Sequence, residues 1–213
     1  MPAIYAARTI LLALHSLLLA GCAHHPATGM DTPANAVAGT ADSGIALLQS
    51  GDLAVRMGRD ITSYMISRLN EQDSSYSHCG LVQVENGYPW VYHCVDNGQG
   101  AGGIRRDSAS RFFSPAQCRA AGIWRYALTP DEQAAMRREI ARYYRRSVSY
   151  DTGFDLETDE QVYCTELVYK VMNIVKHDNA YIPTARRRGV VYVPVDNLYR
   201  DGRASPVWQK AFK

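Results

Sequence analysis

The chain has 213 residues, a formal net charge of +2 and five cysteines. A charge balance so close to neutrality gives no reason to expect a nucleic-acid partner. The cysteines form no Cys-x-x-Cys pair and the sequence has no internal repeat, which argues against a structural zinc site and against a repeat architecture. We therefore expect no metal and no other cofactor.

The N-terminus has the pattern of a bacterial lipoprotein signal peptide. Arg8 precedes a short apolar run that ends in Leu19-Ala20-Gly21-Cys22. The run is too short to span a membrane, and a basic start, an apolar core and a small-residue cleavage site are typical of a secretory leader. The last four residues resemble the lipobox, whose cysteine is lipidated. We expect a signal peptide over residues 1–21 and a lipid anchor at Cys22; the alternative is ordinary secretion with Cys22 as a spare thiol.

Residues 22–44 are predicted to be the lipidated N-terminus and a flexible tether, because they are rich in small and polar residues and have no apolar periodicity. Ala23, which follows the cysteine where an Asp would otherwise signal retention, implies an outer-membrane lipoprotein that faces the periplasm. Residues 45–213 remain, which is enough for one domain with its own core.

Turn, cap and periodicity signals divide this domain into strands and helices. The first half is predicted to contain a turn and strand at 51–56, a helix capped by Asp60 and running through Leu69, strands at 78–84 and 90–95, a glycine-rich connection at 98–103 and a helical segment at 108–113. The second half is predicted to contain a strand at 122–126, a helix from the Thr129–Glu132 capping box to about Arg146, the helix that starts near Cys164, a loop at 186–189, a strand at 190–193, a helical turn at 196–199 and a closing strand at 206–208.

The two strands at 78–84 and 90–95 are joined by Asn86-Gly87, a strong hairpin signal. If these two residues are the centre of the turn, Cys79 lies opposite Cys94, and His78 and His93 project from one face as diagonal neighbours. That face is otherwise built from valines, and a purely structural hairpin rarely places two histidines there. We expect the two imidazoles to lie within reach of each other.

Cys79 and Cys94 point to the opposite face, where two interpretations stay open. Both are buried core residues, or they form a disulfide in an oxidising periplasm. Directly opposed strand residues usually lie wider at Cβ than a relaxed disulfide requires, which disfavours the second.

Cys164 begins the segment Tyr163-Cys164-Thr165-Glu166-Leu167-Val168, which reads as the start of a helix with one apolar face. The unpaired N–H groups of a helix N-terminus stabilise a thiolate, and they also hold an oxyanion. The alternative is a small buried hydrophobe. With His78 as base and His93 to orient it, Cys164 completes a Cys-His-His constellation for nucleophilic catalysis.

Five short motifs occur in an order that resembles a known family: Gly51-Asp52, Ser77-His78-x-Gly80, Tyr150-Asp151, 163–168 and 193–199. They resemble the YiiX/YebB-like branch of the NlpC-type cysteine hydrolases, which is related to the lecithin–retinol acyltransferases. The resemblance covers essentially the whole domain. It implies an α+β, circularly permuted papain-like fold, in which an antiparallel sheet packs against the helix that carries the nucleophilic cysteine.

The resemblance also implies a role for each matching residue. Cys164 matches the nucleophile, His78 the base and His93 a third polar residue, while Tyr150 matches a tyrosine that shapes the oxyanion and substrate site. Histidine at position 93 is the acyltransferase-like choice, where many relatives have glutamate. Since a neutral orienter stabilises the imidazolium less than a carboxylate does, we expect His93→Glu to keep or raise activity.

Three functions follow, from two different classes. The first is a membrane-anchored cysteine hydrolase that cleaves amide bonds through an acyl-enzyme, with peptidoglycan stem peptides as substrate. The second uses the same chemistry for lipid acyl transfer or deacylation. The third is a non-catalytic tethered binding module, and the joint presence of cysteine, two histidines and tyrosine argues against it.

Overall fold

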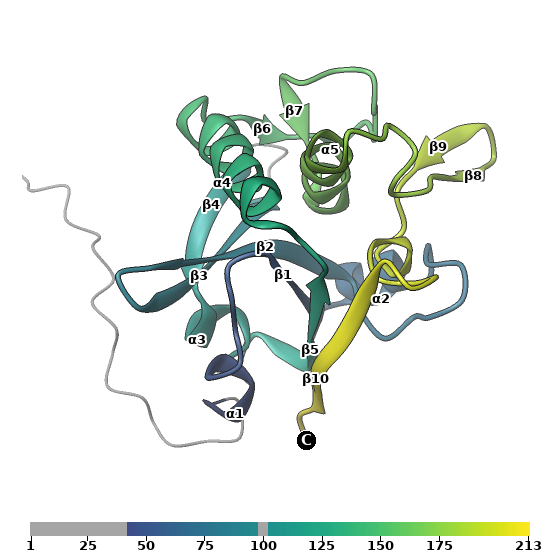
Figure 1. Ribbon diagram of the computed structural model, residues 1–213. Helices are drawn as coiled ribbons and strands as arrows, with labels where there is room; N and C mark the ends of the chain where they lie inside the picture. Colours follow the sequence, from purple (N-terminus) through teal and green to yellow (C-terminus); the bar gives the residue numbers. More distant parts are fainter. Residues whose placement is uncertain (1–41, 98–101) are drawn as a thin grey trace, which may run out of the picture. The chain divides into compact units, whose positions relative to one another are not determined.

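A curled, mostly antiparallel sheet of eight strands organises the residues that the structure describes, 42–97 and 102–213 (Figure 1). The structure is a computed structural model. The strand order is β10-β5-β1-β2-β3-β4-β6-β7, and only the short β6–β7 pair in this sheet is parallel. The predicted α+β class is confirmed at this level. The predicted signal peptide and the lipidation site at Cys22 lie outside the described residues.

The strands of the large sheet are β1 (Asp52–Gly58), β2 (His78–Glu85), β3 (Tyr88–Val95), β4 (Gly103–Ser108), β5 (Cys118–Tyr126), β6 (Ser149–Tyr150), β7 (Gln161–Val162) and β10 (Ala204–Ala211). A separate hairpin pairs β8 (Ala185–Arg187) with β9 (Val190–Tyr192). The helices are α1 (Asp42–Ile45), α2 (Ile61–Ser67), α3 (Ala109–Phe112), α4 (Pro130–Arg145), α5 (Cys164–Lys176) and the 3-10 turn η1 (Asp196–Leu198).

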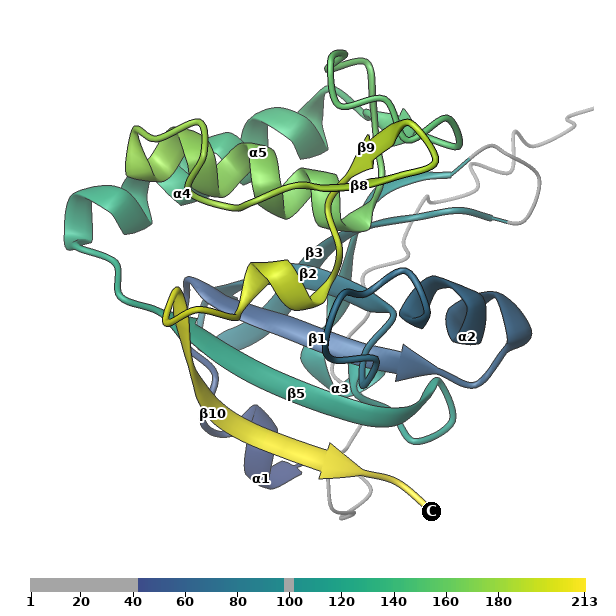
Figure 2. The same ribbon diagram turned by 90° about the vertical axis from the view of Figure 1, so that its right-hand side faces the viewer.

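Each face of the sheet is covered by a different set of helices (Figure 2). On one face, α4 and α5 pack against alternate residues of β1, β2 and β3, among them Leu53, Leu81 and Tyr92. On the other face, α1 and α3 enclose a smaller core around Val82, Val91 and the α3 phenylalanines. Burial of both faces of a central strand matches the nearly continuous apolar character of β1. No helix within 42–97 and 102–213 is long and apolar enough to cross a membrane.

The predicted hairpin register is confirmed. Leu81 pairs with Tyr92 and Glu85 with Tyr88 across the turn. Asn86 and Gly87 have φ values of 52° and 82°, the left-handed conformations that a two-residue type I′ turn requires. This register fixes which strand residues face α5 and which face α3.

The helix caps that the sequence predicts are also present. The Asp60 carboxylate accepts a hydrogen bond from the Ser63 N–H at 2.8 Å and caps α2. Thr129 and Glu132 form the reciprocal capping box of α4. The cysteine helix α5 begins at Cys164, as predicted.

Two predictions of irregular structure were correct only in part. The loop predicted at 186–189 is wrong at Arg186 and Arg187, which belong to β8 and pair with β9, whereas Arg188 and Gly189 form the turn between the two strands and have positive φ. In the connection predicted at 98–103, Gly103 is the first residue of β4, while residues 98–101 lie outside the described part of the chain. Both strands are short and rich in exposed arginine, so their sequences lack the apolar alternation that marks a strand.

Candidate active site

A cavity of about 250 Å³ lies beside the N-terminus of α5 and brings together most of the predicted site residues. Cys164, His78 and Tyr150 all line it. His93 lies behind His78 and is fully buried. Residues that are 86 positions apart in the sequence, from His78 to Cys164, therefore share one cavity.

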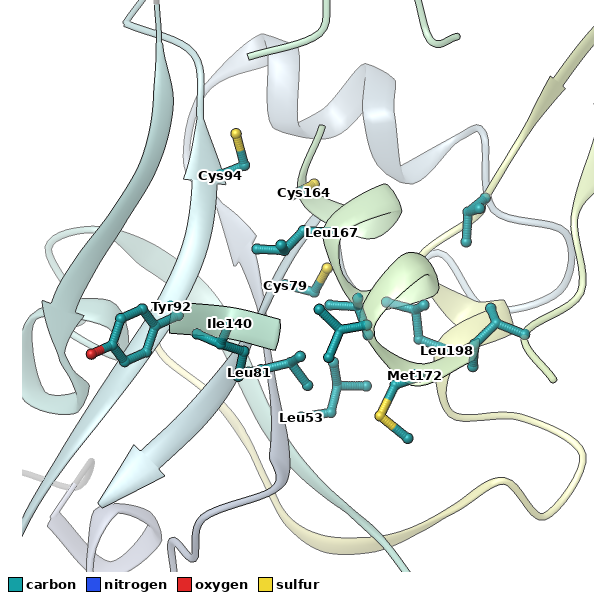
Figure 3. Packing of buried hydrophobic residues seen from close by; sticks show 14 of the residues in the cluster. Leu53, Cys79, Leu81, Tyr92, Cys94, Ile140, Cys164, Leu167, Met172 and Leu198 are labelled. Carbon is teal, nitrogen blue, oxygen red and sulfur yellow. The ribbon is translucent and has the colours of Figure 1, made fainter. Parts of the chain in front are cut away.

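Cys164 is the first residue of α5, and its sulfur lies against β2 (Figure 3). The pKa of its thiol is lowered, chiefly by a hydrogen bond from the Cys79 thiol; burial opposes this shift, and the backbone N–H groups of Cys79 and Thr165 add to it. Burial together with the Cys164 charge raises the pKa of Cys79 well above its usual value. The pair thus has an acceptor, Cys164, and a donor, Cys79.

The described cysteines are free thiols, and Cys79 and Cys94 have different partners. The Cys94 sulfur donates to the Val162 carbonyl oxygen at 3.0 Å, while the Cys79 thiol acts on the pKa of Cys164. Of the two interpretations that the sequence left open, the structure therefore shows buried core residues, and Cys79 also contacts the candidate nucleophile.

A chain of hydrogen bonds runs from His78 into the protein. His78 Nε2 lies 2.8 Å from His93 Nδ1, and His93 Nε2 lies 3.2 Å from the Asp107 carboxylate. Because a carboxylate only accepts, His93 donates from Nε2, its Nδ1 accepts, and His78 donates from Nε2. The remaining nitrogen, His78 Nδ1, then carries a lone pair. Asp107 thereby sets the tautomers of both histidines and leaves His78 able to accept a proton.

Gly80 makes the close approach of the two strands possible at this point. A Cβ on Gly80 would lie 2.7 Å from the Tyr92 carbonyl oxygen and 2.9 Å from the His93 Cβ. Any larger residue would displace the strand that carries His93. The Ser77-His78-x-Gly80 pattern thus has a steric reason.

The pKa shifts of the chain favour neutral imidazoles. Burial, the Arg56 cation and His93 hold the pKa of His78 well below its usual value. Burial also lowers the pKa of His93, although Asp107 opposes this. Burial alone would raise the pKa of Asp107, but hydrogen bonds from His93 and Arg105 lower it well below its usual value, so this carboxylate stays charged.

Arg56 is a half-buried cation that the sequence analysis did not assign to the site. It lines the cavity, its guanidinium lies 4.6 Å from the centre of the Phe112 ring, and it donates to the Phe112 carbonyl oxygen at 3.2 Å. Its charge acts on His78 and on Cys164. Since a cation favours a thiolate and disfavours an imidazolium, Arg56 supports a charged sulfur beside a neutral base.

Tyr150 meets the geometric requirement for the predicted substrate-orienting role, because it lines the cavity with Cys164. Burial, followed by the charge of Cys164, raises the pKa of its phenol, so the hydroxyl keeps its proton and is available as a donor.

The segment 193–199 fixes the start of α5. The Thr165 hydroxyl donates to the Val193 carbonyl oxygen at 2.6 Å, and the Val193 N–H donates to the Tyr163 hydroxyl at 3.0 Å. The side chain of Thr165 supplies the hydroxyl that this contact needs.

Asp107, Arg56 and Cys79 are the site residues that sequence reasoning missed or assigned elsewhere. Arg56 pairs with His78 across β1 and β2, and Asp107 pairs with Val91 across β3 and β4. The hairpin turn gives the β2–β3 register locally, but no turn signal links β1 to β2 or gives the partner of β4. The residues that lie beside the two histidines on neighbouring strands could therefore not be predicted from the sequence.

No protein-family model matches the chain, and no curated protein matches it. Among solved structures, the chain is similar to the crystal structure of the metalloprotein yiiX from Escherichia coli O157:H7, with a TM-score of 0.63 and 17% sequence identity, over 76% of this chain and 98% of that one. The chain therefore has a YiiX-like fold, in agreement with the resemblance in its motifs.

The relative's metal does not fit the residues found here. No group of three or more His, Cys, Asp or Glu side chains within the described ranges is arranged to hold a metal ion. His78 Nε2 and His93 Nδ1 bond to each other, so neither nitrogen points to a common ligand position.

Proposed function

We propose that the chain is a cysteine hydrolase that acts through an acyl-enzyme, with Cys164 as nucleophile, His78 as base and His93 as the residue that orients the base. The observation that carries this proposal is the Asp107–His93–His78 chain, whose last member lines the same cavity as a cysteine with a lowered thiol pKa. In a purely structural core, nothing requires this combination.

The mechanism begins with removal of the Cys164 proton. His78 Nδ1 accepts it, and the sulfur attacks the substrate carbonyl carbon. The oxyanion of the tetrahedral intermediate is held by the Cys164 backbone N–H and the Tyr150 hydroxyl. His78 then returns the proton to the leaving nitrogen, which releases the first product, and water hydrolyses the acyl-enzyme with His78 again as base.

The chain order supports a circularly permuted papain-like arrangement. The proposed base on β2 precedes the proposed nucleophile on α5, whereas papain-like enzymes in the unpermuted order place the cysteine first. In both orders the cysteine begins a helix that packs on a sheet. We propose this arrangement for residues 45–213.

We propose amide bonds of cell-wall peptides as the substrate, and the lipidated Cys22 as the anchor that holds the enzyme at the outer membrane facing the periplasm. A second candidate, acyl transfer or deacylation of lipids, has one observation in its favour. The cavity lining includes the apolar residues Ile66, Leu69, Phe154 and Val195. Release of peptide fragments from cell walls supports the first candidate, and exchange or loss of acyl chains on phospholipid supports the second.

The first experiment is mass-resolved alkylation of the mature-domain cysteines with iodoacetamide across pH. Cys164 is expected to react faster than the other cysteines, at a pH well below the usual thiol pKa. The substitution His78→Ala is expected to slow the alkylation of Cys164. Cys118, buried and outside the cavity lining, is the internal control. If Cys164 reacts no faster than Cys118 and does not respond to His78→Ala, the hydrolase proposal is wrong and the binding-module interpretation leads.

The proposed anchor has its own test. Cells fed a clickable fatty acid should label the wild-type chain and not Cys22→Ser. Equal labelling of both chains would contradict lipidation at this cysteine.

A further inference from the structure

Helix α2 carries large apolar residues on its outer face. These are Ile61, Tyr64 and Met65, whose exposed fractions are 73%, 49% and 65%. Its inner face carries Ile66 together with the small polar residues Ser63 and Ser67. The spacing of the outer residues, i, i+3 and i+4, places them on one side of the helix. Large apolar residues that face outward on a short helix indicate a surface that another phase or molecule covers.

The β8–β9 hairpin extends this surface. Arg187 donates to the Arg68 carbonyl oxygen at 3.2 Å, and the Tyr192 hydroxyl donates to the Leu69 carbonyl oxygen at 2.8 Å, so the hairpin lies against the end of α2. Val190, in the hairpin, is 50% exposed. We call Ile61, Tyr64, Met65 and Val190 the apolar rim.

Five exposed arginines lie in the segments that carry the apolar rim or flank them. They are Arg59, Arg68, Arg186, Arg187 and Arg188. None of the five has an acidic partner within ion-pair distance among the described residues, although Asp60 and Glu71 lie in the same stretch of chain. Exposed apolar side chains next to arginines without an ion-pair partner match the surface of an anionic bilayer, which offers hydrocarbon below negatively charged headgroups.

The elements that carry the rim also line the cavity. Ser63 and Ile66 on the inner side of α2 line the cavity, as does Tyr192 at the end of β9. Figure 2 shows α2 beyond the end of β1 and the hairpin above it, next to α5. A bilayer against the rim would therefore lie one helix away from the cavity.

We propose that the apolar rim and its arginines dock this domain on an anionic phospholipid bilayer, with the cavity one helix away from the bilayer. Docking of this kind presents the site to substrates held at a membrane. The proposal does not depend on the chemistry at Cys164, and a Cys164→Ala chain is expected to dock in the same way.

The test uses the full chain with a tryptophan added at the rim, and the signal is the difference from the parent chain, whose three tryptophans give a common background. A signal from this one position separates docking from any attachment through the N-terminus. Met65→Trp is mixed with vesicles of phosphatidylcholine and phosphatidylglycerol, or of phosphatidylcholine alone, with and without brominated acyl chains. The matched control is Tyr88→Trp, at a residue that is 53% exposed at the β2–β3 turn, away from α2. We expect a blue shift and bromine quenching for Met65→Trp with anionic vesicles only.

A second comparison tests the arginines next to the rim. In the Met65→Trp chain, Arg187→Gln with Arg188→Gln is expected to weaken the anionic-vesicle signal roughly tenfold or more. Leu47→Ser with Ile174→Ser, which removes similarly exposed apolar residues elsewhere, is expected to leave it unchanged. The proposal is overturned if Met65→Trp behaves as Tyr88→Trp does. It is also overturned if the blue shift appears without vesicles and grows with protein concentration, since the rim would then cover a second copy of the chain.

Discussion

Asp107 is expected to decide how well His78 acts as a base. Asp107→Ala leaves the buried N–H of His93 without its acceptor, and a buried unpaired donor costs about 1–3 kcal/mol, so we expect activity to fall roughly 10- to 100-fold. Asp107→Asn keeps an acceptor but loses the charge, and its effect should be smaller. The measurement is a pH–rate profile, in which loss of the charge moves the pKa of the histidine pair further down.

The control for Asp107→Ala is Glu85→Gln. Glu85 is a carboxylate on the same sheet that, like Asp107, accepts hydrogen bonds from an aromatic residue and an arginine, here the Tyr92 hydroxyl and Arg106. Glu85 has no contact with either histidine in the described structure. Equal losses in Asp107→Ala and Glu85→Gln would mean that Asp107 acts only through stability.

The presence of Asp107 changes the outcome expected for His93→Glu. If His93 were the last residue of the hydrogen-bond chain, a carboxylate at position 93 would stabilise the protonated form of the base. In the structure, a charged carboxylate already lies 3.2 Å from His93, so His93→Glu would bring two carboxylates together in a buried place. We now expect His93→Glu to lose activity, and His93→Glu with Asp107→Asn to recover part of it. Activity of the single variant at or above wild type would contradict this.

Cys79 is expected to tune the nucleophile. Its thiol is the main cause of the lowered pKa of Cys164, so Cys79→Ala should raise that pKa and slow alkylation of Cys164 near neutral pH. Cys94→Ala is the matched control, since Cys94 donates to the Val162 carbonyl instead. The direction of the change in the Cys164 pKa is tested by the pH at which the alkylation rate reaches half its maximum. This pH should move upward only in Cys79→Ala.

At the scale of elements, the parts of the fold that were predictable are those whose causes are local. Asn86-Gly87 determines the hairpin register, Asp60 begins α2, and the Thr129–Glu132 box begins α4, each through contacts within a few residues. The order of the strands is set by pairings between distant segments, such as β1 between β2 and β5, and no local pattern encodes them. The pairing of β3 with β4 is of this kind and places Asp107 beside His93, so Asp107 could not be predicted as a site residue.

The 3-10 turn η1 braces the loop that leads into His78. The fully buried Asp196 carboxylate accepts three backbone hydrogen bonds, from Glu71, Gln72 and Asp73, at 2.8–3.2 Å. Asn70 adds a fourth link, since its side chain accepts from the Val195 N–H at 3.0 Å. Segments that lie more than 120 positions apart are thus held together just before β2.

Asp196→Asn is expected to loosen this loop. The amide offers one acceptor oxygen instead of two, so at least one buried N–H loses its partner, and we expect a loss of about 1–3 kcal/mol of unfolding free energy. Hydrogen exchange should quicken at residues 71–73 before other parts of the sheet respond. Asp201→Asn, at an exposed carboxylate, is the control. Unchanged exchange at 71–73 would show that the loop does not depend on Asp196.

At the scale of the whole molecule, the candidate site lies where two differently built cores meet. Cys164 and Cys79 belong to the core under α4 and α5, whereas His93 packs edge-on against Phe112 of the core under α3. His78 is the first residue of β2, so it can reach the cavity at the end of the sheet while its neighbour Cys79 faces α5. The nucleophile and the base are therefore held by opposite faces of one sheet, and the global stability of the fold determines whether they stay aligned.

Glu166 links that global stability to pH. It is fully buried in the first turn of α5, where it accepts from the Tyr163 N–H at 3.1 Å and pairs with Lys170 at 3.1 Å. Burial nevertheless raises its pKa from 4.5 to about 7. Between these two values the folded protein binds more protons at this residue than the unfolded chain does, so the contribution of Glu166 to stability is full below pH 4.5 and is lost as the pH rises through 7.

Glu166→Gln should remove this dependence. The wild type is expected to lose up to about 3 kcal/mol of unfolding free energy at this residue between pH 5 and pH 8, because each unit of pKa shift corresponds to about 1.4 kcal/mol. For Glu166→Gln, the unfolding free energy should depend less on pH than it does for the wild type. The variant should be more stable than the wild type at pH 8 if losing the ion pair with Lys170 costs less free energy than burying the carboxylate does. Urea denaturation at both pH values measures this, with the exposed Glu157→Gln as control. A wild type and a Glu166→Gln chain with parallel pH profiles would mean that the Lys170 ion pair fully offsets the burial of the carboxylate.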